Sequence, residues 1–175
     1  MKTILIVYHS LTGGTRQMAD AAARGAKAQA DVQVHLLQAR EAGPGDVLNA
    51  DGHIFATPEN LAAMAGIMKD FFDRTYYPVL DRINGRPYAI LICAGSDGQN
   101  AARQIERIAT GWRLRAIADP IIVCTHAQTP QSLNTNEAVR GAGRHSRTFS
   151  KLRRSRRTKA PKLLCTPGPM TLDTL

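Results

Sequence analysis

The residue pattern with the clearest chemical meaning is a short run of hydroxyl and glycine residues near the start of the chain, Ser10-Leu11-Thr12-Gly13-Gly14-Thr15. It follows an apolar run typical of a buried strand, residues 4–8, and it precedes an alanine-rich stretch with helical character. Glycines allow the backbone to turn tightly, and a helix that starts there presents unpaired N–H groups and the positive end of its dipole. The pattern therefore predicts a loop that binds a phosphate group.

The same loop lacks the features of a nucleoside-triphosphate site. That motif requires a Gly-Lys pair before the last hydroxyl residue, whereas Arg16 follows Thr15 here and the loop contains no lysine. The composition favours one terminal phosphate over a triphosphate with magnesium. A simpler interpretation, which the six residues alone leave open, is a turn that caps a helix, because Ser, Thr and Gly are common at such positions.

Strand-like apolar runs recur along the chain, and each is separated from the next by enough residues for a crossover. They span residues 3–8, 32–37, 53–56, 88–94 and 120–125. Between them, apolar residues at spacings of three and four predict helices, most clearly from Met64 to Thr75 and from Ala101 to Trp112. Both stripes are expected to pack in the core. Strands that alternate with helices form a parallel sheet covered on both faces, so we expect a three-layer α/β protein.

Charge divides the chain of 175 residues, whose formal net charge is +9, into two parts. Residues 1–127 contain 13 Lys and Arg against 12 Asp and Glu, whereas residues 128–175 contain 10 against 2. Apolar periodicity also stops near residue 130. We interpret residues 1–127 as one domain and residues 128–175 as a basic, poorly ordered tail, with the final helix degenerate or missing. Translation out of frame and a recruited basic arm are two open explanations.

The cysteines give no sign of a metal site. Cys93 and Cys124 lie in apolar runs and Cys165 lies in the tail, without the close Cys/His spacing of a zinc site. We expect reduced thiols and no bound metal. The first apolar stretch is too short for a secretory signal, and no run approaches the roughly 20 apolar residues of a membrane span. These features predict a cytoplasmic protein without a membrane segment.

Two further polar segments follow later strands. Thr57-Pro58-Glu59-Asn60 comes after the third strand-like run, and Ala94-Gly95-Ser96-Asp97-Gly98 comes after the fourth. In an open α/β sheet, ligands bind beyond the carboxyl ends of the strands, where the strand order reverses. The loops after the first, third and fourth strands are therefore predicted to surround one ligand.

Taken in order, the three segments resemble the flavodoxin-like FMN-binding family. The resemblance covers about residues 2–127 and rests on S-x-T-G-x-T, on T-P-E-N followed by M-A-G-I-M-K-D-F-F-D-R, and on A-G-S-D-G. The second motif is most similar to the NAD(P)H-dependent FMN and quinone reductases. The resemblance implies a five-stranded parallel sheet with the strand order 2-1-3-4-5.

The resemblance also implies which residues bind FMN. Those implied for the phosphate are Ser10, Thr12, Gly13, Gly14 and Thr15. Those beside the isoalloxazine ring are Thr57, Pro58, Glu59 and Asn60 on one side and, through backbone groups, Ala94, Gly95, Ser96 and Gly98 on the other, with Asp97 near the ribityl chain or the ring edge. FMN supplies the redox chemistry, so no side chain is expected as a catalytic acid or base. Glu59 is expected to be a loop carboxylate whose backbone N–H matters more than its side chain. The histidines at strand ends, His9 and His126, are expected to be bystanders.

The resemblance favours an oxidoreductase that passes electrons from NADH or NADPH through FMN to a quinone, a flavin or a similar small acceptor. Neither ring-flanking segment contains an aromatic residue, and residues 1–127 lack the acidic excess that steers a basic redox partner. An aromatic side chain that stacks on the flavin would therefore have to come from Tyr76, from Tyr77 or from a neighbouring subunit.

Two alternatives stay open. The first is a non-enzymatic electron carrier with the same fold and cofactor. The second is non-specific nucleic-acid binding by the basic residues 140–162, against which an incidental tail is the simpler explanation. The electron acceptor, the choice between NADH and NADPH, and the formation of a homo-oligomer are not encoded in any motif.

Overall fold

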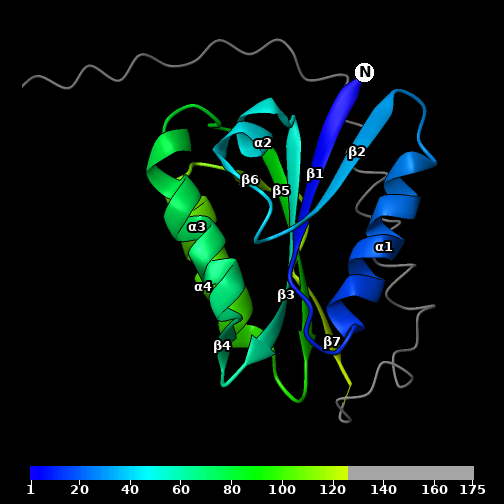
Figure 1. Ribbon diagram of the computed structural model, residues 1–175, viewed down its shortest axis with the longest axis vertical. Coiled ribbons are helices and arrows are strands. Elements are labelled where there is room, and N and C mark those ends of the chain that lie inside the picture. The colour runs from blue at the N-terminus through cyan, green and yellow to red at the C-terminus, as the bar shows by residue number, and fades with distance from the viewer. Residues whose placement is uncertain (126–175) are drawn as a thin grey trace, which may run out of the picture.

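The computed structural model describes residues 1–125, which form a central sheet with helices on both faces (Figure 1). The predictions about the basic tail, the final helix and a shifted reading frame concern residues that lie outside the described part of the chain. His126 lies outside it as well.

Five strands form the parallel sheet that the sequence predicts. They are β1 (Lys2–Tyr8), β2 (Val32–Gln38), β3 (Gly52–Asn60), β5 (Pro87–Ala94) and β7 (Ile121–Cys124). Strand β1 pairs with β2 and β3, strand β3 pairs with β5, and β5 pairs with β7, all in parallel. In these five strands the predicted order 2-1-3-4-5 is confirmed, and the α/β class is confirmed with it.

Two short strands bring the sheet to seven strands and correct the prediction of five. Strand β4 (Ala63–Met64) pairs antiparallel with the end of β3, and β6 (Arg115–Ala116) pairs parallel with the start of β5. The chain reverses before β4 at Leu61 and Ala62, whose φ angles are 50° and 58°. Two-residue turns with positive φ normally carry Asn or Gly. No residue pattern therefore indicates this hairpin.

Four helices cover the sheet in the described part of the chain. Helix α1 (Gly14–Lys27) lies on one face, and α3 (Gly66–Val79) and α4 (Gln99–Gly111) lie on the other, with the short α2 (Pro44–Asn49) against α3 (Figure 1). The alanine stripe of α1 is fully buried, which allows the helix to lie close to the strands. Within residues 1–125, no helix is both long enough and apolar enough to cross a membrane.

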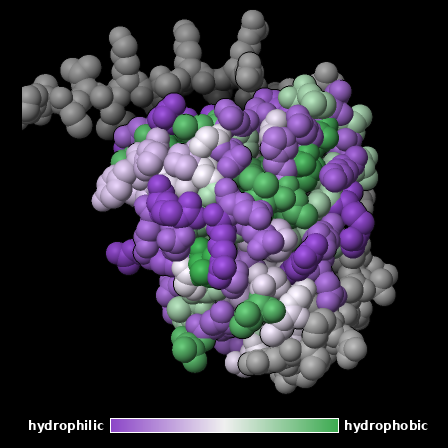
Figure 2. Space-filling model, viewed as in Figure 1, coloured by the Kyte–Doolittle hydropathy of each residue, from purple (hydrophilic) through white to green (hydrophobic). Residues whose placement is uncertain are grey.

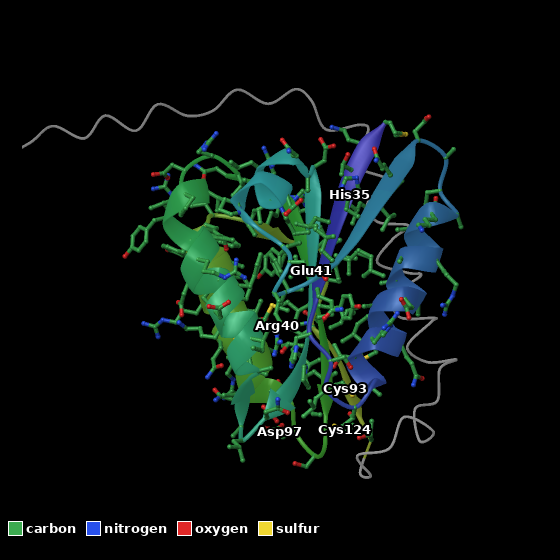
Figure 3. The ribbon with its side chains drawn as sticks, viewed as in Figure 1. His35, Arg40, Glu41, Cys93, Asp97 and Cys124 are labelled. Atoms are coloured by element: carbon green, nitrogen blue, oxygen red, sulfur yellow. The ribbon has the colours of Figure 1, made fainter. Side chains whose placement is uncertain are left out.

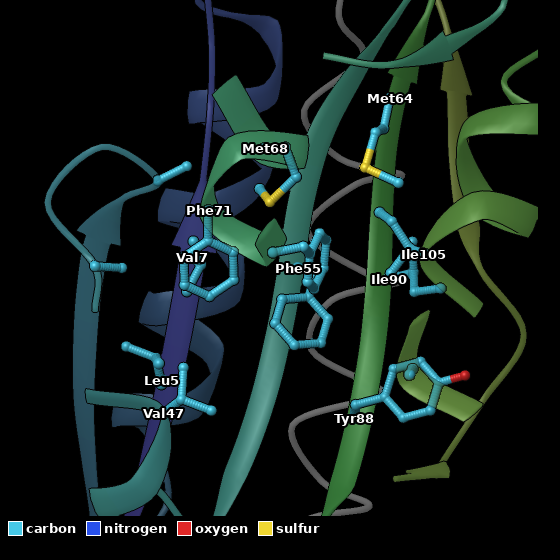
Figure 4. Packing of buried hydrophobic residues seen from close by; sticks show 14 of the residues in the cluster. Leu5, Val7, Val47, Phe55, Met64, Met68, Phe71, Tyr88, Ile90 and Ile105 are labelled. Carbon is cyan, nitrogen blue, oxygen red and sulfur yellow. The ribbon is translucent and has the colours of Figure 1, made fainter. Parts of the chain in front are cut away.

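The larger core lies between the sheet and helices α3 and α4. Phe55 of β3 packs against Phe71, Phe72 and Trp112, with ring centroids 6.3, 5.1 and 6.3 Å away. Figure 4 shows Phe55 and Phe71 together with Met68 of α3 and with Met64, which lies in β4 and not in the helix predicted from the sequence. The methionine and aromatic stripe is therefore core, as predicted, and Trp112 is fully buried in it.

Candidate functional site

The three segments predicted to bind the ligand lie at one edge of the sheet. The loops after β1 and β5 follow the carboxyl ends of parallel strands, whereas residues 57–60, predicted to follow the third strand, are the last four residues of β3. Figure 3 shows Cys93, Asp97 and Cys124 at this lower end of the molecule and His35 far above it. The structure thus brings the three loops together, as the switch-point rule requires.

The β1–α1 loop has the geometry of an anion-binding helix start. Gly13 is the N-cap residue of α1 and has a φ of 94°, in the left-handed region that favours glycine. Its N–H donates to the Oγ of Ser10 at 3.0 Å, and Gly13 itself has no side chain that could pair the amides that follow it. The N–H groups of Gly14, Thr15 and Arg16 cannot be paired within α1. They leave the positive end of the helix dipole open to a phosphate.

The three hydroxyls of this loop lie at different depths. Thr12 is exposed, Ser10 is half-buried and Thr15 is only 1% exposed. The Thr15 side chain hydrogen-bonds the thiol of Cys93. Burial raises the pKa of Cys93, and the bond from Thr15 opposes that effect in part. The Thr15 hydroxyl therefore faces the sheet, and the hydroxyls nearer the surface are those of Ser10 and Thr12.

The carboxylate of Glu59 ties the end of β3 to the start of α4. Its two oxygens accept hydrogen bonds from the N–H groups of Gly98, at 2.7 Å, and Ala101, at 3.3 Å. Gly98 is the N-cap of α4, so a side chain from another strand caps this helix and lies at the positive end of its dipole. The expectation of a loop carboxylate is therefore wrong: Glu59 lies in β3, its side chain is engaged in structure, and it is not placed as a general base. The start of α4 offers no second phosphate site.

Thr57 also acts within the fold. Its side chain is fully buried, and its Oγ1 accepts a hydrogen bond from the Ala65 N–H at 3.2 Å and donates to the Pro58 carbonyl at 3.1 Å. These bonds fix the chain between β3 and the start of α3. Pro58 is half-buried, and Asn60 is exposed at the end of the strand.

The loop after β5 contains three exposed residues, Gly95, Ser96 and Asp97, between the buried Ala94 and Gly98. Two groups near the end of β7 hold it in place. They are the Cys124 thiol, which donates to the Ser96 carbonyl at 3.0 Å, and the Thr125 N–H, which donates to the Ala94 carbonyl at 2.9 Å. The backbone of the loop is therefore fixed while its surface remains open to a ligand.

Gly98 can only be glycine. Its φ is 80°, and a Cβ atom there would lie 2.5 Å from the Cγ2 atom of Ile122 and 3.1 Å from the Cβ of Ala94. The A-G-S-D-G motif thus has a physical reason at its last position, because the β5–α4 loop packs directly on β7.

Tyr76 and Tyr77 lie near the opposite end of α3 from these loops. The ring of Tyr76 stacks on Trp112, with centroids 5.9 Å apart and an interplanar angle of 18°. Tyr77 is 79% exposed. Neither tyrosine is placed to stack on a ligand bound by its own chain, which removes two of the three sources of a stacking ring considered from the sequence.

The histidines in the described part of the chain are dispersed. His9 is half-buried after β1, and burial and, to a smaller extent, the charge of Arg40 lower its pKa. His53 is fully buried beside α2, where its Nε2 hydrogen-bonds the Val47 carbonyl at 3.1 Å and burial lowers its pKa to about 4. His35 is exposed on β2. Within residues 1–125, no three His, Cys, Asp or Glu side chains are grouped closely enough to hold a metal ion.

The strand order, the glycine-capped start of α1 and the loops at the carboxyl edge define a doubly wound α/β protein of the flavodoxin-like type. Residues 45–129 of the sequence match the model of the NADPH-dependent FMN reductase family. This match agrees with the resemblance inferred from the second and third motifs, and the loop of residues 10–15 lies outside it.

Individual relatives include both enzymes and flavodoxins. An NAD(P)H dehydrogenase (quinone) of Acidithiobacillus ferrooxidans is 38% identical over 95 residues, which cover 43% of this chain and 48% of that protein. A flavodoxin of Aquifex aeolicus is 35% identical over 86 residues, 49% of this chain and 46% of that protein. The chain thus spans about half the length of these curated relatives.

Solved structures agree in fold. The flavodoxin of Streptococcus pneumonia TIGR4 superposes with a TM-score of 0.72 at 19% identity, over 86% of this chain and 99% of that one. At this level of identity the likeness concerns the fold, and the function has to be argued from the site.

Proposed function

We propose that the chain binds FMN, with the terminal phosphate at the β1–α1 loop. The observation that carries this proposal is the open start of α1. The N–H groups of residues 14–16 directly follow Gly13, whose φ is left-handed, and the Ser10 and Thr12 hydroxyls belong to the same loop. Glu59 caps the start of α4. A single phosphate therefore suits this edge better than a polyphosphate.

In this proposal the isoalloxazine ring lies between the β3–β4 turn and the β5–α4 loop. Asn60 and the loop residues Gly95, Ser96 and Asp97 are exposed there and offer polar groups to the ring edge. Thr57 and Glu59 hold the backbones that border the ring, and Pro58, Ala94 and Gly98 shape them. When bound, FMN supplies hydride and single-electron transfer. The protein therefore has to bind the cofactor, orient its ring and leave one face of the ring accessible.

We infer further that the protein is an oxidoreductase that takes electrons from NADH or NADPH and delivers them to a small acceptor such as a quinone or a flavin. The support from this chain is the absence of any aromatic residue from residues 57–64 and 94–100, so that neither ring-flanking loop covers the ring with an aromatic side chain. The family description and the enzyme names among the relatives agree with this role. We place the reaction in the cytoplasm, where thiols such as Cys93 and Cys124 stay reduced.

A non-enzymatic electron carrier is the second candidate, and the flavodoxin among the relatives favours it. The two are separated by mixing FMN-loaded protein with NADH or NADPH in an anaerobic stopped-flow experiment. An oxidoreductase shows bleaching of the flavin absorption without any other protein, followed by recovery when a quinone is added. A carrier shows no bleaching with either nucleotide but is reduced by dithionite through a stable one-electron state.

A further inference from the structure

Three side chains make four hydrogen bonds that fasten the β3–β4 hairpin to helix α4. Besides the contacts of Glu59, Asn100 donates from Nδ2 to the Ala62 carbonyl at 2.5 Å, and the Gln104 Oε1 accepts from the Met64 N–H at 2.9 Å. We call Glu59, Asn100 and Gln104 the hairpin clamp. The partners in each bond are about 40 residues apart in sequence, so the clamp joins two separate units of the fold.

The turn that the clamp holds is strained. Leu61 and Ala62 both have positive φ, a backbone conformation that is unfavourable for residues with a Cβ atom. Leu61 is fully exposed, so no burial of its side chain offsets this cost. Figure 2 shows small, separate green patches at the lower end of the molecule, the end at which Figure 1 places β4. The turn keeps its shape because its two ends are fixed.

The other end of the clamp is rigid. Gly98 is buried, and a Cβ atom there would overlap Ile122 and Ala94, so its backbone lies directly on β5 and β7. Glu59 binds the N–H of this residue with one oxygen and the N–H of Ala101 with the other. A carboxylate at the length of glutamate is therefore needed to satisfy both amides at once.

We propose that Glu59 is a positioning residue that makes the β3–β4 turn and the β5–α4 loop one preorganised unit. These are the two loops between which the proposed function places the isoalloxazine ring, and the functional part of the inference rests on that proposal. Because the clamp fixes both loops before any cofactor arrives, FMN binding does not have to order them. Glu59 touches the amides of α4 and acts on the ring only through the loops it holds.

The test compares Glu59→Gln and Glu59→Asp with the control Glu41→Gln. Glutamine keeps the length and loses the charge, whereas aspartate keeps the charge and loses the reach to two amides. Glu41 is exposed, and its substitution by glutamine changes the net charge equally without touching the clamp. Amide hydrogen exchange of the FMN-free protein is measured at residues 60–65 and 95–102, and FMN affinity is measured by fluorescence quenching.

We expect both Glu59 variants to exchange about tenfold faster in both segments together, since one charge-assisted hydrogen bond corresponds to roughly that factor or more. FMN affinity should fall by a similar factor in both variants and stay unchanged in Glu41→Gln. Asn100→Ala, at an exposed position, should speed amide exchange at residues 60–65, and it replaces the Glu59 variants in the test if these do not fold.

Unchanged exchange at residues 95–102 in both Glu59 variants overturns the clamp. Weakened FMN binding in Glu59→Gln but normal binding in Glu59→Asp shows a charge effect on the ligand and also overturns it. If the native protein binds no FMN while amide exchange responds as expected, the hairpin clamp is confirmed as a structural feature only. Glu59 then has no positioning role for a ligand, and the proposed function is contradicted by a separate observation.

Discussion

The buried His53 predicts a loss of stability in mild acid that a non-titrating variant should abolish. Burial lowers the pKa of His53 from 6.5 to about 4, because a charged imidazole has no access to water beside α2. Nε2 already pairs with the Val47 carbonyl, and Nδ1 has no hydrogen-bond partner. The proton that acid would add therefore enters a site without a partner.

The size of the effect follows from the two pKa values. Above pH 6.5 the histidine is neutral in both the folded and the unfolded chain, and the full free energy of unfolding is present. Between pH 6.5 and about 4 the unfolded chain takes up the proton while the folded chain does not, so stability falls with falling pH. With about 1.4 kcal/mol for each pH unit, the loss reaches about 3 kcal/mol and levels off below pH 4.

The assay is urea unfolding at pH 7.5, 6, 5 and 4 for the native protein and for His53→Gln, whose amide can still donate to the Val47 carbonyl. The difference between the two profiles isolates His53, because His9 also has a lowered pKa and contributes to both. We expect the native protein to lose about 3 kcal/mol more than the variant over this range. Equal losses in the two proteins would refute the reasoning.

Three further predictions concern other parts of the structure. Gly98→Ala should lower the free energy of unfolding by roughly 2 kcal/mol or more, because the new Cβ atom combines a positive φ with overlap against Ile122. Thermal unfolding measures this loss, and a loss below about 0.5 kcal/mol contradicts the prediction. Arg86→Met should lower the free energy of unfolding by about 2 kcal/mol, since Nη1 of Arg86 donates to the carbonyls of Val47, Leu48 and Ala50. An unchanged midpoint of urea unfolding would show that these hydrogen bonds do not stabilise the fold. Ser10→Ala should weaken FMN about tenfold but leave riboflavin affinity unchanged, and equal weakening of both ligands in a fluorescence titration would place Ser10 away from the phosphate.

Much of the fold could be predicted from the sequence because its signals are local. Apolar runs such as residues 88–94 locate the long strands, and the spacing from Met64 to Thr75 locates α3. Strand β4 could not be predicted, since Leu61 and Ala62 adopt a turn that their residue types disfavour. The hydrogen bonds that fix this turn come from Asn100 and Gln104 of α4, about 40 residues further along the chain.

The candidate site divides in the same way. The β1–α1 loop could be located because its glycines and hydroxyls act on neighbouring backbone, as the Ser10 bond to Gly13 shows. The functions of Glu59 and Thr15 could not be deduced, because their partners Gly98 and Cys93 are brought close only by the packing of separate strands. Long-range pairs of this kind leave no spacing pattern in a single sequence.

The most direct test of the central claim, that the β1–α1 loop holds the phosphate of FMN, is a titration of the flavin-free protein with FMN and with riboflavin under the same conditions. The open start of α1 predicts that FMN binds at least tenfold more tightly, because only FMN brings an anion to the unpaired amides of residues 14–16. Equal affinity for the two flavins, or no binding of either, would contradict it.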